Sequence, residues 1–302
     1  MLDFINKGVT GFRMDAALYV HPEATADMIN QVHGSRPETK FLMELLVPRE
    51  AVLHRMMVEL KKLVTHSSKI FYFDFPQMYE IRRIQEQKDY HLSWLMGYLQ
   101  NLNRIGMDRS KLVPTITNHD FGTAFADSGL EEIAFALSEF SSFHSNLLFP
   151  HLDRSNPHSK DNNRQVISGY QASKDSIGNL VGVFKKALEP YRLTKEIMAN
   201  PDIWTGNKWV PLNDLSKDFI ENYRSAEGRY GRDSLALKMS LEGRKLFLFV
   251  KKDDLPHTFH FHLRGESGEM KVLYQMNNPA VTLGDSIKIE SNGRTVVLIE
   301  MN

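Results

Sequence analysis

The sequence predicts an α/β protein: a parallel β-sheet with helices between its strands, followed by a small antiparallel β domain. Apolar β-type runs at residues 9–14, 40–45, 69–75 and 112–118 alternate with amphipathic helical segments. This alternation is typical of βα units and a parallel sheet. From about residue 234, short strands follow one another with only Gly, Asp and Asn turns between them, which indicates antiparallel pairing.

Each element follows from its local pattern. Residues 146–150 (NLLFP) are a candidate fifth strand, residues 151–169 form a polar surface loop, and residues 175–198 carry apolar positions at helical spacing. Further helices are expected at residues 22–33, 49–65, within 78–105 and at 130–143, and antiparallel strands at 234–241, 245–250, 257–263, 270–275 and 294–300.

Composition narrows the classes of function. The 302 residues include 37 Lys and Arg against 37 Asp and Glu, so the net charge is zero, which argues against a nucleic-acid or anionic-membrane partner. There is no cysteine, which excludes disulfides and thiolate metal sites. No apolar run approaches the roughly 20 residues of a membrane span, and residues 1–12 lack a signal-peptide pattern, so we expect a cytoplasmic chain by default.

Two carboxylates end the first two predicted strands. Arg13 and Asp15 share one face of the first strand because side chains alternate, and a guanidinium so close would favour the ionised carboxylate. Such a carboxylate suits a nucleophile. Taken alone, an R-x-D pattern on a strand is more often a buried Arg–Asp pair of purely structural value. Glu44 ends the run FLMEL, where apolar neighbours would suit a general acid; alone, it could equally begin a helix or form an ion pair.

A third carboxylate ends the fourth run, in PTITNHD. His119 and Asp120 follow Asn118 there, and an N-cap or Asx turn is the structural alternative for this segment. Three carboxylates at the carboxyl ends of three parallel strands match the edge where βα-barrel active sites lie. Two carboxyls held close together are the apparatus of retaining glycosidases.

These three segments resemble the motifs of the α-amylase family, glycoside hydrolase family 13, and they occur in the family's order. GFRMDAA is similar to the segment with the nucleophilic Asp, FLMEL to the strand that ends in the acid/base Glu, and PTITNHD to the segment whose Asp stabilises the transition state. The resemblance covers nearly the whole chain. It implies a partial (β/α)8 TIM barrel, about strands four to eight, followed by a small antiparallel β-sandwich domain.

The resemblance also implies domain boundaries and a chemistry. Residues 1–200 would be a truncated catalytic barrel, residues 201–233 a connecting segment and residues 234–302 the β domain. The implied activity is that of a retaining α-glycosidase or transglycosylase on α-glucosidic bonds. The implied catalytic residues are Asp15, Glu44 and Asp120, and the implied substrate-binding residues are Arg13, His119 and Tyr19.

The sequence departs from the family in two places. Only about ten residues precede the nucleophile strand, where the family has three βα units, so we expect an incomplete chain with weak or no activity unless a partner chain supplies the missing barrel half. Leu18 and Tyr19 stand where many α-amylases have Lys-His. A tyrosine at this position would pack or stack on a sugar rather than bind calcium, which favours sucrose, trehalose or short oligosaccharides as substrates. We expect no metal and no cofactor.

Two alternatives stay open from the sequence. One is a non-catalytic fragment or degenerate homologue that binds carbohydrate or another chain through its exposed sheet. The other is an unrelated α/β enzyme in which the three motifs coincide by chance. His257, His260 and His262 are interpreted as surface histidines of a β strand rather than as a metal cluster.

Overall fold

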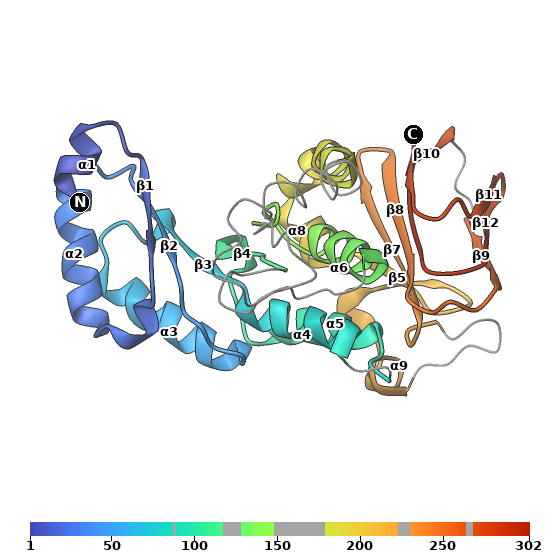
Figure 1. The fold of residues 1–302 in the computed structure, drawn as a ribbon, viewed down its shortest axis with the longest axis horizontal. Coiled ribbons are helices and arrows are strands. Elements are labelled where there is room, and N and C mark those ends of the chain that lie inside the picture. The colour runs from blue at the N-terminus through green and yellow to red at the C-terminus, as the bar shows by residue number, and fades with distance from the viewer. Residues whose placement is uncertain (87–88, 117–127, 148–178, 223–229, 264–267) are drawn as a thin grey trace, which may run out of the picture.

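The structure is a computed structural model that describes residues 1–86, 89–116, 128–147, 179–222, 230–263 and 268–302. A parallel sheet with helices leads into two antiparallel sheets, which confirms the predicted fold class. The parallel sheet and its first helices lie at one end of an elongated molecule, and the antiparallel sheets lie at the other end (Figure 1).

The parallel sheet contains four strands in the order β1-β2-β3-β4 within the described residues. Each strand lies within a run that the sequence predicts. In register, Arg13 lies beside Leu42, which lies beside Phe71, so equivalent positions line up across the sheet. The strands are β1 (Gly11–Met14), β2 (Lys40–Met43), β3 (Ile70–Phe73) and β4 (Leu112–Val113).

The candidate fifth strand at residues 146–150 is described only as far as Leu147. Its backbone N–H donates to the carbonyl oxygen of Pro114 at 2.9 Å, and the Thr115 hydroxyl donates to the Leu147 carbonyl oxygen at 3.0 Å. This segment therefore lies beside the chain that continues from β4. Residues 148–150 and the predicted loop at 151–169 lie outside the described residues.

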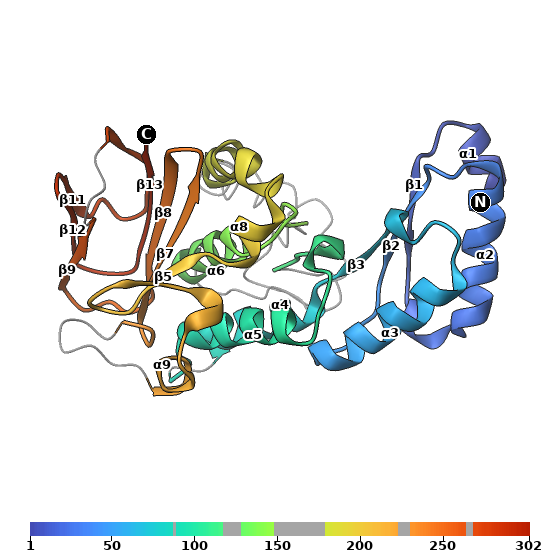
Figure 2. The same ribbon diagram turned by 180° about the vertical axis from the view of Figure 1, so that it is seen from behind.

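Helices connect the parallel strands and cover the sheet (Figures 1 and 2). Residues 179–192 are helical within the predicted segment 175–198, whose first four residues lie outside the described residues. The prediction of one helix was wrong, because a turn at residues 193–194 separates residues 179–192 from a further short helix. The other helices are α1 (Leu2–Asn6), α2 (Pro22–Ser35), α3 (Glu50–Leu63), α4 (Phe75–Glu86), α5 (Ser93–Arg104), α6 (Ser128–Phe140), α8 (Lys195–Ala199) and α9 (Lys217–Asn222).

The helical region predicted within residues 78–105 is two helices, α4 and α5. Between them, the Leu92 N–H donates to the Arg232 carbonyl oxygen at 3.0 Å and the Ser93 N–H donates to the Gly231 carbonyl oxygen at 2.7 Å. These hydrogen bonds hold the segment against a distant part of the chain. A tertiary contact therefore replaces the helical hydrogen bonds at this point.

Two antiparallel sheets form the second part of the molecule. The six-stranded sheet has the order β10-β13-β8-β7-β5-β6, and the three-stranded sheet has the order β11-β12-β9. The sequence prediction missed β5, β6, β11 and β12, and β5 and β6 have only three residues each, too few to show an alternation. The strands are β5 (Asp202–Trp204), β6 (Trp209–Pro211), β7 (Ser234–Leu241), β8 (Arg244–Lys251), β9 (His257–His262), β10 (Met270–Gln275), β11 (Ala280–Leu283), β12 (Ser286–Ser291) and β13 (Thr295–Met301).

The domain boundaries at residues 200 and 234 stay a prediction. The pairing of β5 with β7 joins residues 202–204 to the six-stranded sheet.

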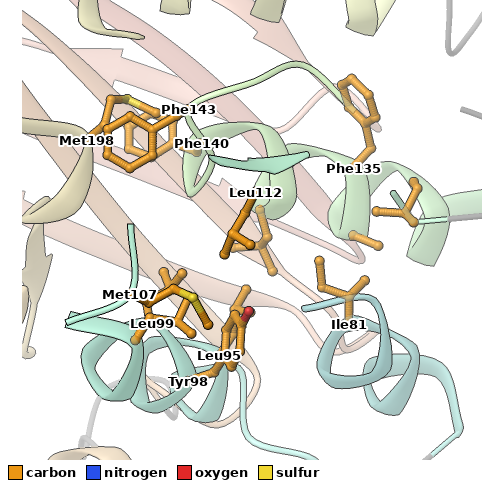
Figure 3. Packing of buried hydrophobic residues seen from close by; sticks show 14 of the residues in the cluster. Ile81, Leu95, Tyr98, Leu99, Met107, Leu112, Phe135, Phe140, Phe143 and Met198 are labelled. Atoms are coloured by element: carbon orange, nitrogen blue, oxygen red, sulfur yellow. The ribbon is translucent and has the colours of Figure 1, made fainter. Parts of the chain in front are cut away.

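One hydrophobic core extends from the helices onto the six-stranded sheet. Leu237 and Leu248 belong to the cluster that also contains the buried residues of α5 and α6, whereas Phe247 and Phe249 face the three-stranded sheet. The helix side of this core is drawn in Figure 3, where Leu112 lies between α5 and α6. The shared core ties the sheet that carries the candidate site to the β-sandwich behind it. Among the described residues, no helix has the length and apolar content that a membrane crossing requires.

Candidate active site

Asp15 and Glu44 occupy equivalent positions at the carboxyl ends of β1 and β2. Met14 is paired with Met43, and the Glu44 N–H continues this ladder by donating to the Met14 carbonyl oxygen at 3.0 Å. Each carboxylate is therefore the first residue after its strand. The Asp15 side chain is 72% exposed and the Glu44 side chain only 7% exposed, so two neighbouring carboxylates have very different environments.

Arg13 contacts both carboxylates. Its Nη1 atom lies 2.7 Å from Asp15 Oδ1, and its Nη2 atom lies 2.5 Å from Glu44 Oε1. The guanidinium is planar and rigid, so two carboxyls bound by its two terminal nitrogens are held in a fixed relation. The sequence prediction gave Arg13 a partner in Asp15. The second partner, Glu44, reaches Arg13 because β2 pairs with β1 in the sheet.

The other oxygen of Glu44 is bound by the main chain. The Ala16 N–H donates to Glu44 Oε2 at 3.0 Å. Ala16 has φ 48° and ψ 34°, a left-handed conformation that is uncommon for a residue other than glycine. Glu44 therefore has a polar partner at each oxygen, in addition to the apolar neighbours that the sequence indicates.

The face of the sheet that carries Arg13 has a small apolar cluster of its own. Phe73, Phe75 and Met78 are buried there, with Leu42 packed against them, and the Arg13 guanidinium lies 5.9 Å from the centre of the Phe73 ring. Phe12 and Met14 pack instead into the main core, on the helix side. The alternation predicted for β1 therefore separates a polar, carboxylate-bearing face from the helix-covered face.

Tyr19 lies close in sequence to this edge, in the 3-10 turn η1 (Ala17–Tyr19). Its side chain is 82% exposed, which is high for an aromatic residue. No contact between Tyr19 and the two carboxylates is described. His119 and Asp120 lie outside the described residues, so their positions relative to Asp15 and Glu44 stay predictions.

Sequence reasoning missed a further carboxylate at this end of the sheet, Asp74, which directly follows β3. The Tyr98 hydroxyl donates to Asp74 Oδ1 at 2.5 Å, and the Gln77 N–H, in the first turn of α4, donates to the same atom at 3.1 Å. Asp74 follows Phe73, which faces Arg13, so it points to the opposite, helix-covered side. The sequence pattern that could have identified Asp74 is its place directly after the apolar run KIFYF, just as Glu44 directly follows FLM.

Burial controls the ionisation of Asp74. Removal from water raises the pKa of this carboxyl to about 6, while the hydrogen bonds from Tyr98 and Gln77 and the charge of Arg109 act in the opposite direction. Burial also lowers the pKa of Arg109 to about 10. Asp74 is thus buried on the side of the sheet opposite to Arg13 and bound by Tyr98 and Gln77.

The described residues contain no group of three or more acidic or histidine side chains arranged to hold a metal ion. His260 and His262 alternate with the buried Phe259 and Phe261 along β9 and are exposed, as the interpretation of surface histidines requires.

The fold and the strand-end carboxylates define the class of the protein as a partial βα barrel with a C-terminal antiparallel β domain. Solved structures with this fold are α-amylases and related enzymes. An α-amylase from Anoxybacillus superposes with a TM-score of 0.64 at 13% identity, covering 99% of this chain and 60% of its own. An α-amylase from H. orenii gives a TM-score of 0.60 at 11% identity, covering 99% of this chain and 62% of its own.

A Gamma-CGTase from an alkalophilic Bacillus clarkii gives a TM-score of 0.62 at 14% identity, covering 99% of this chain and 41% of its own. The chain thus has the fold of part of an α-amylase structure and spans less than two thirds of the length of these neighbours. No protein-family model and no curated protein sequence matches it.

Proposed function

We propose that the chain carries part of the active site of a retaining α-glycosidase or transglycosylase that acts on α-glucosidic bonds. The observation that supports this most is the Arg13 guanidinium, which contacts both Asp15 and Glu44 at the ends of adjacent parallel strands. In a βα barrel this edge of the sheet is where catalysis occurs. Two carboxylates in different environments suit two different roles in glycoside hydrolysis.

In the proposed mechanism, Glu44 protonates the glycosidic oxygen while Asp15 attacks the anomeric carbon. The bond to the leaving sugar breaks and a covalent glycosyl–Asp15 ester forms. Glu44 then accepts a proton from water or from an acceptor sugar, whose oxygen attacks the same carbon and releases Asp15. Two inversions give net retention. Asp120 and His119 are proposed to hold sugar hydroxyls, and Tyr19 is proposed to contact the leaving-group sugar.

The substrate is proposed to be sucrose, trehalose or a short oligosaccharide. Leu18 and Tyr19 take the place of two polar residues at the turn after Asp15, so an aromatic surface is available for a sugar ring. One of the superposed structures, an α-amylase from Geobacillus thermoleovorans, was solved with acarbose, with a TM-score of 0.54 at 11% identity. That ligand is therefore a reasonable probe for this chain.

A partner chain is proposed to supply the βα units that complete the barrel. β1 is an edge strand within the described part of the sheet, and Phe4 and Val9 beside it are exposed apolar residues. An unpaired parallel edge is normally covered. We therefore expect weak or no turnover by the chain alone. A non-catalytic chain that binds carbohydrate or a partner is the second candidate, favoured by this open edge.

The test is sugar release by the purified chain from sucrose, trehalose, maltose and malto-oligosaccharides, with Glu44→Gln and Asp15→Asn as matched isosteric controls. The retaining mechanism is supported if both substitutions abolish the release and if NMR shows the α-anomer as the first product. Release that survives both substitutions refutes the assignment of these carboxylates. Binding of acarbose without any release is expected of both candidates, and a chain that carries the missing βα units is then added: release on its addition supports the enzyme, and no release supports the non-catalytic candidate.

A further inference from the structure

We propose that Ala16 is a positioning residue for Glu44: its N–H binds the carboxyl, and its left-handed backbone joins this contact to the turn that carries Tyr19. The relevance of this role to catalysis rests on the function proposed above. The link between the Ala16 backbone and the Glu44 carboxyl does not depend on that function.

The backbone of Ala16 is unusual for its residue type. Among the described residues, positive φ values at positions other than glycine occur at Ala16, Glu242, Asn277 and Asn278. Glu242 lies in the turn between β7 and β8, and the two asparagines follow β10, where such conformations are common in turns. Alanine has no side-chain group to stabilise this conformation. Its surroundings must therefore impose it.

Ala16 makes two main-chain hydrogen bonds in this conformation. The Ala16 N–H donates to Glu44 Oε2 at 3.0 Å, and the Ala16 carbonyl oxygen accepts from the Tyr19 N–H at 3.0 Å. The second bond closes the 3-10 turn η1. An extended Ala16 would continue β1, and its carbonyl could not turn back to Tyr19. The left-handed conformation therefore makes both bonds available at one residue.

Glu44 is fixed at two points as a result. Arg13 holds Oε1 and Ala16 holds Oε2, so rotation of the carboxyl group breaks one or both contacts. Arg13 comes from β1 before Asp15 and Ala16 comes directly after it. The segment that contains the proposed nucleophile thus binds both carboxyl oxygens of the proposed acid/base. Catalytic groups need this kind of fixed geometry.

The decisive experiment compares Ala16→Val and Ala16→Gly by NMR of the purified chain. The side-chain carboxyl ¹³C resonance of Glu44 is assigned by its loss in Glu44→Gln. A β-branched residue resists the left-handed region, whereas glycine adopts it freely and keeps the N–H. We expect Ala16→Val to shift the Glu44 resonance and Ala16→Gly to leave it within the linewidth. The matched control is Glu242→Val, at φ 49° but remote from the site, which should leave it unchanged.

A second measurement covers the case in which Ala16→Val does not fold. Hydrogen exchange of the Ala16 amide is compared in the wild type, Glu44→Gln and Glu44→Ala. We expect Glu44→Ala to speed exchange at least about tenfold, and Glu44→Gln, whose amide oxygen can still accept the bond, to change it much less. Equal exchange in all three proteins, or an unchanged Glu44 resonance in a folded Ala16→Val, overturns the proposal.

Neither readout requires sugar turnover. A chain that never releases sugar but shows both effects keeps the positioning role and loses the proposed function. If the chain releases sugar but the Glu44 resonance does not shift in Ala16→Val, the proposed function stands and the positioning role of Ala16 is refuted.

Discussion

The Arg13 guanidinium binds the buried carboxyl of Glu44 across two adjacent strands, with 2.5 Å between Nη2 and Oε1. The partner at the other nitrogen, Asp15, is exposed, so the contact with Glu44 is the one shielded from solvent. The contribution of Arg13 to the stability of the fold should therefore come mainly from its contact with Glu44.

Replacing Arg13 should destabilise the fold. Arg13→Ala leaves a buried carboxylate without its guanidinium, and we expect the free energy of unfolding to fall by about 1–3 kcal/mol. The measurement is urea denaturation followed by circular dichroism. The control is Lys217→Ala, which removes an exposed ion pair with Glu221 (3.4 Å) and should cost about 0.5 kcal/mol or less. Equal stability of the two variants would contradict this assignment.

The Asp74 carboxyl should give the stability a distinctive pH dependence. Burial raises its pKa in the folded chain to about 6 from 3.8, so between these values the folded state holds a proton that the unfolded state has released. Stability from this group is therefore present below about pH 4 and lost as the pH rises through 6. The difference between the two pKa values corresponds to roughly 3 kcal/mol in the free energy of unfolding.

Asp74→Asn isolates this contribution, because asparagine can still accept from Tyr98 and Gln77 but does not titrate. Thermal or urea unfolding is measured from pH 4 to pH 7 in both proteins. We expect the variant to gain stability relative to the wild type as the pH rises across this window. A constant difference between the two curves would show that Asp74 has an ordinary pKa.

Two helical glycines, Gly97 in α5 and Gly182 in the helix at residues 179–192, should respond differently to the same substitution although their intrinsic helix preferences are equal. A Cβ atom at Gly97 would lie 2.7 Å from Ile220 Cγ2, whereas a Cβ atom at Gly182 meets nothing within 4 Å. We expect Gly97→Ala to lower the free energy of unfolding by about 1–2 kcal/mol through overpacking against α9. Gly182→Ala should raise it by about 0.5–1 kcal/mol. A stabilised Gly97→Ala would show that α5 and α9 are not in close contact.

Much of the site-bearing sheet could be predicted because its strands are short apolar runs bounded by polar residues. Asp15 and Glu44 each end such a run, and parallel strands bring their carboxyl ends to one edge. This reasoning places both residues without any knowledge of register. It cannot show that Arg13 reaches Glu44, because that contact depends on which strands are neighbours.

Other features depend on contacts between distant residues. The break between α4 and α5 follows from hydrogen bonds to Gly231 and Arg232, and no helix-breaking pattern marks it in the sequence. The left-handed conformation of Ala16 likewise occurs where its N–H binds Glu44, 28 positions away. Alanine favours helices in general, so local preference predicts the opposite. In both cases tertiary hydrogen bonds override local propensity.

Tyr19 offers the most direct test of carbohydrate recognition. Its ring is 82% exposed, so Tyr19→Ala should change the free energy of unfolding by less than about 0.5 kcal/mol. If the ring stacks on a sugar, the same substitution should weaken acarbose binding at least about fivefold, since an aromatic contact contributes about 1 kcal/mol. Tyr19→Phe keeps the ring and should retain most of the affinity. Isothermal titration calorimetry measures both. Equal affinity of Tyr19→Ala and the wild type would remove Tyr19 from the site, and the absence of any acarbose binding by the wild type would count against sugar recognition by this chain.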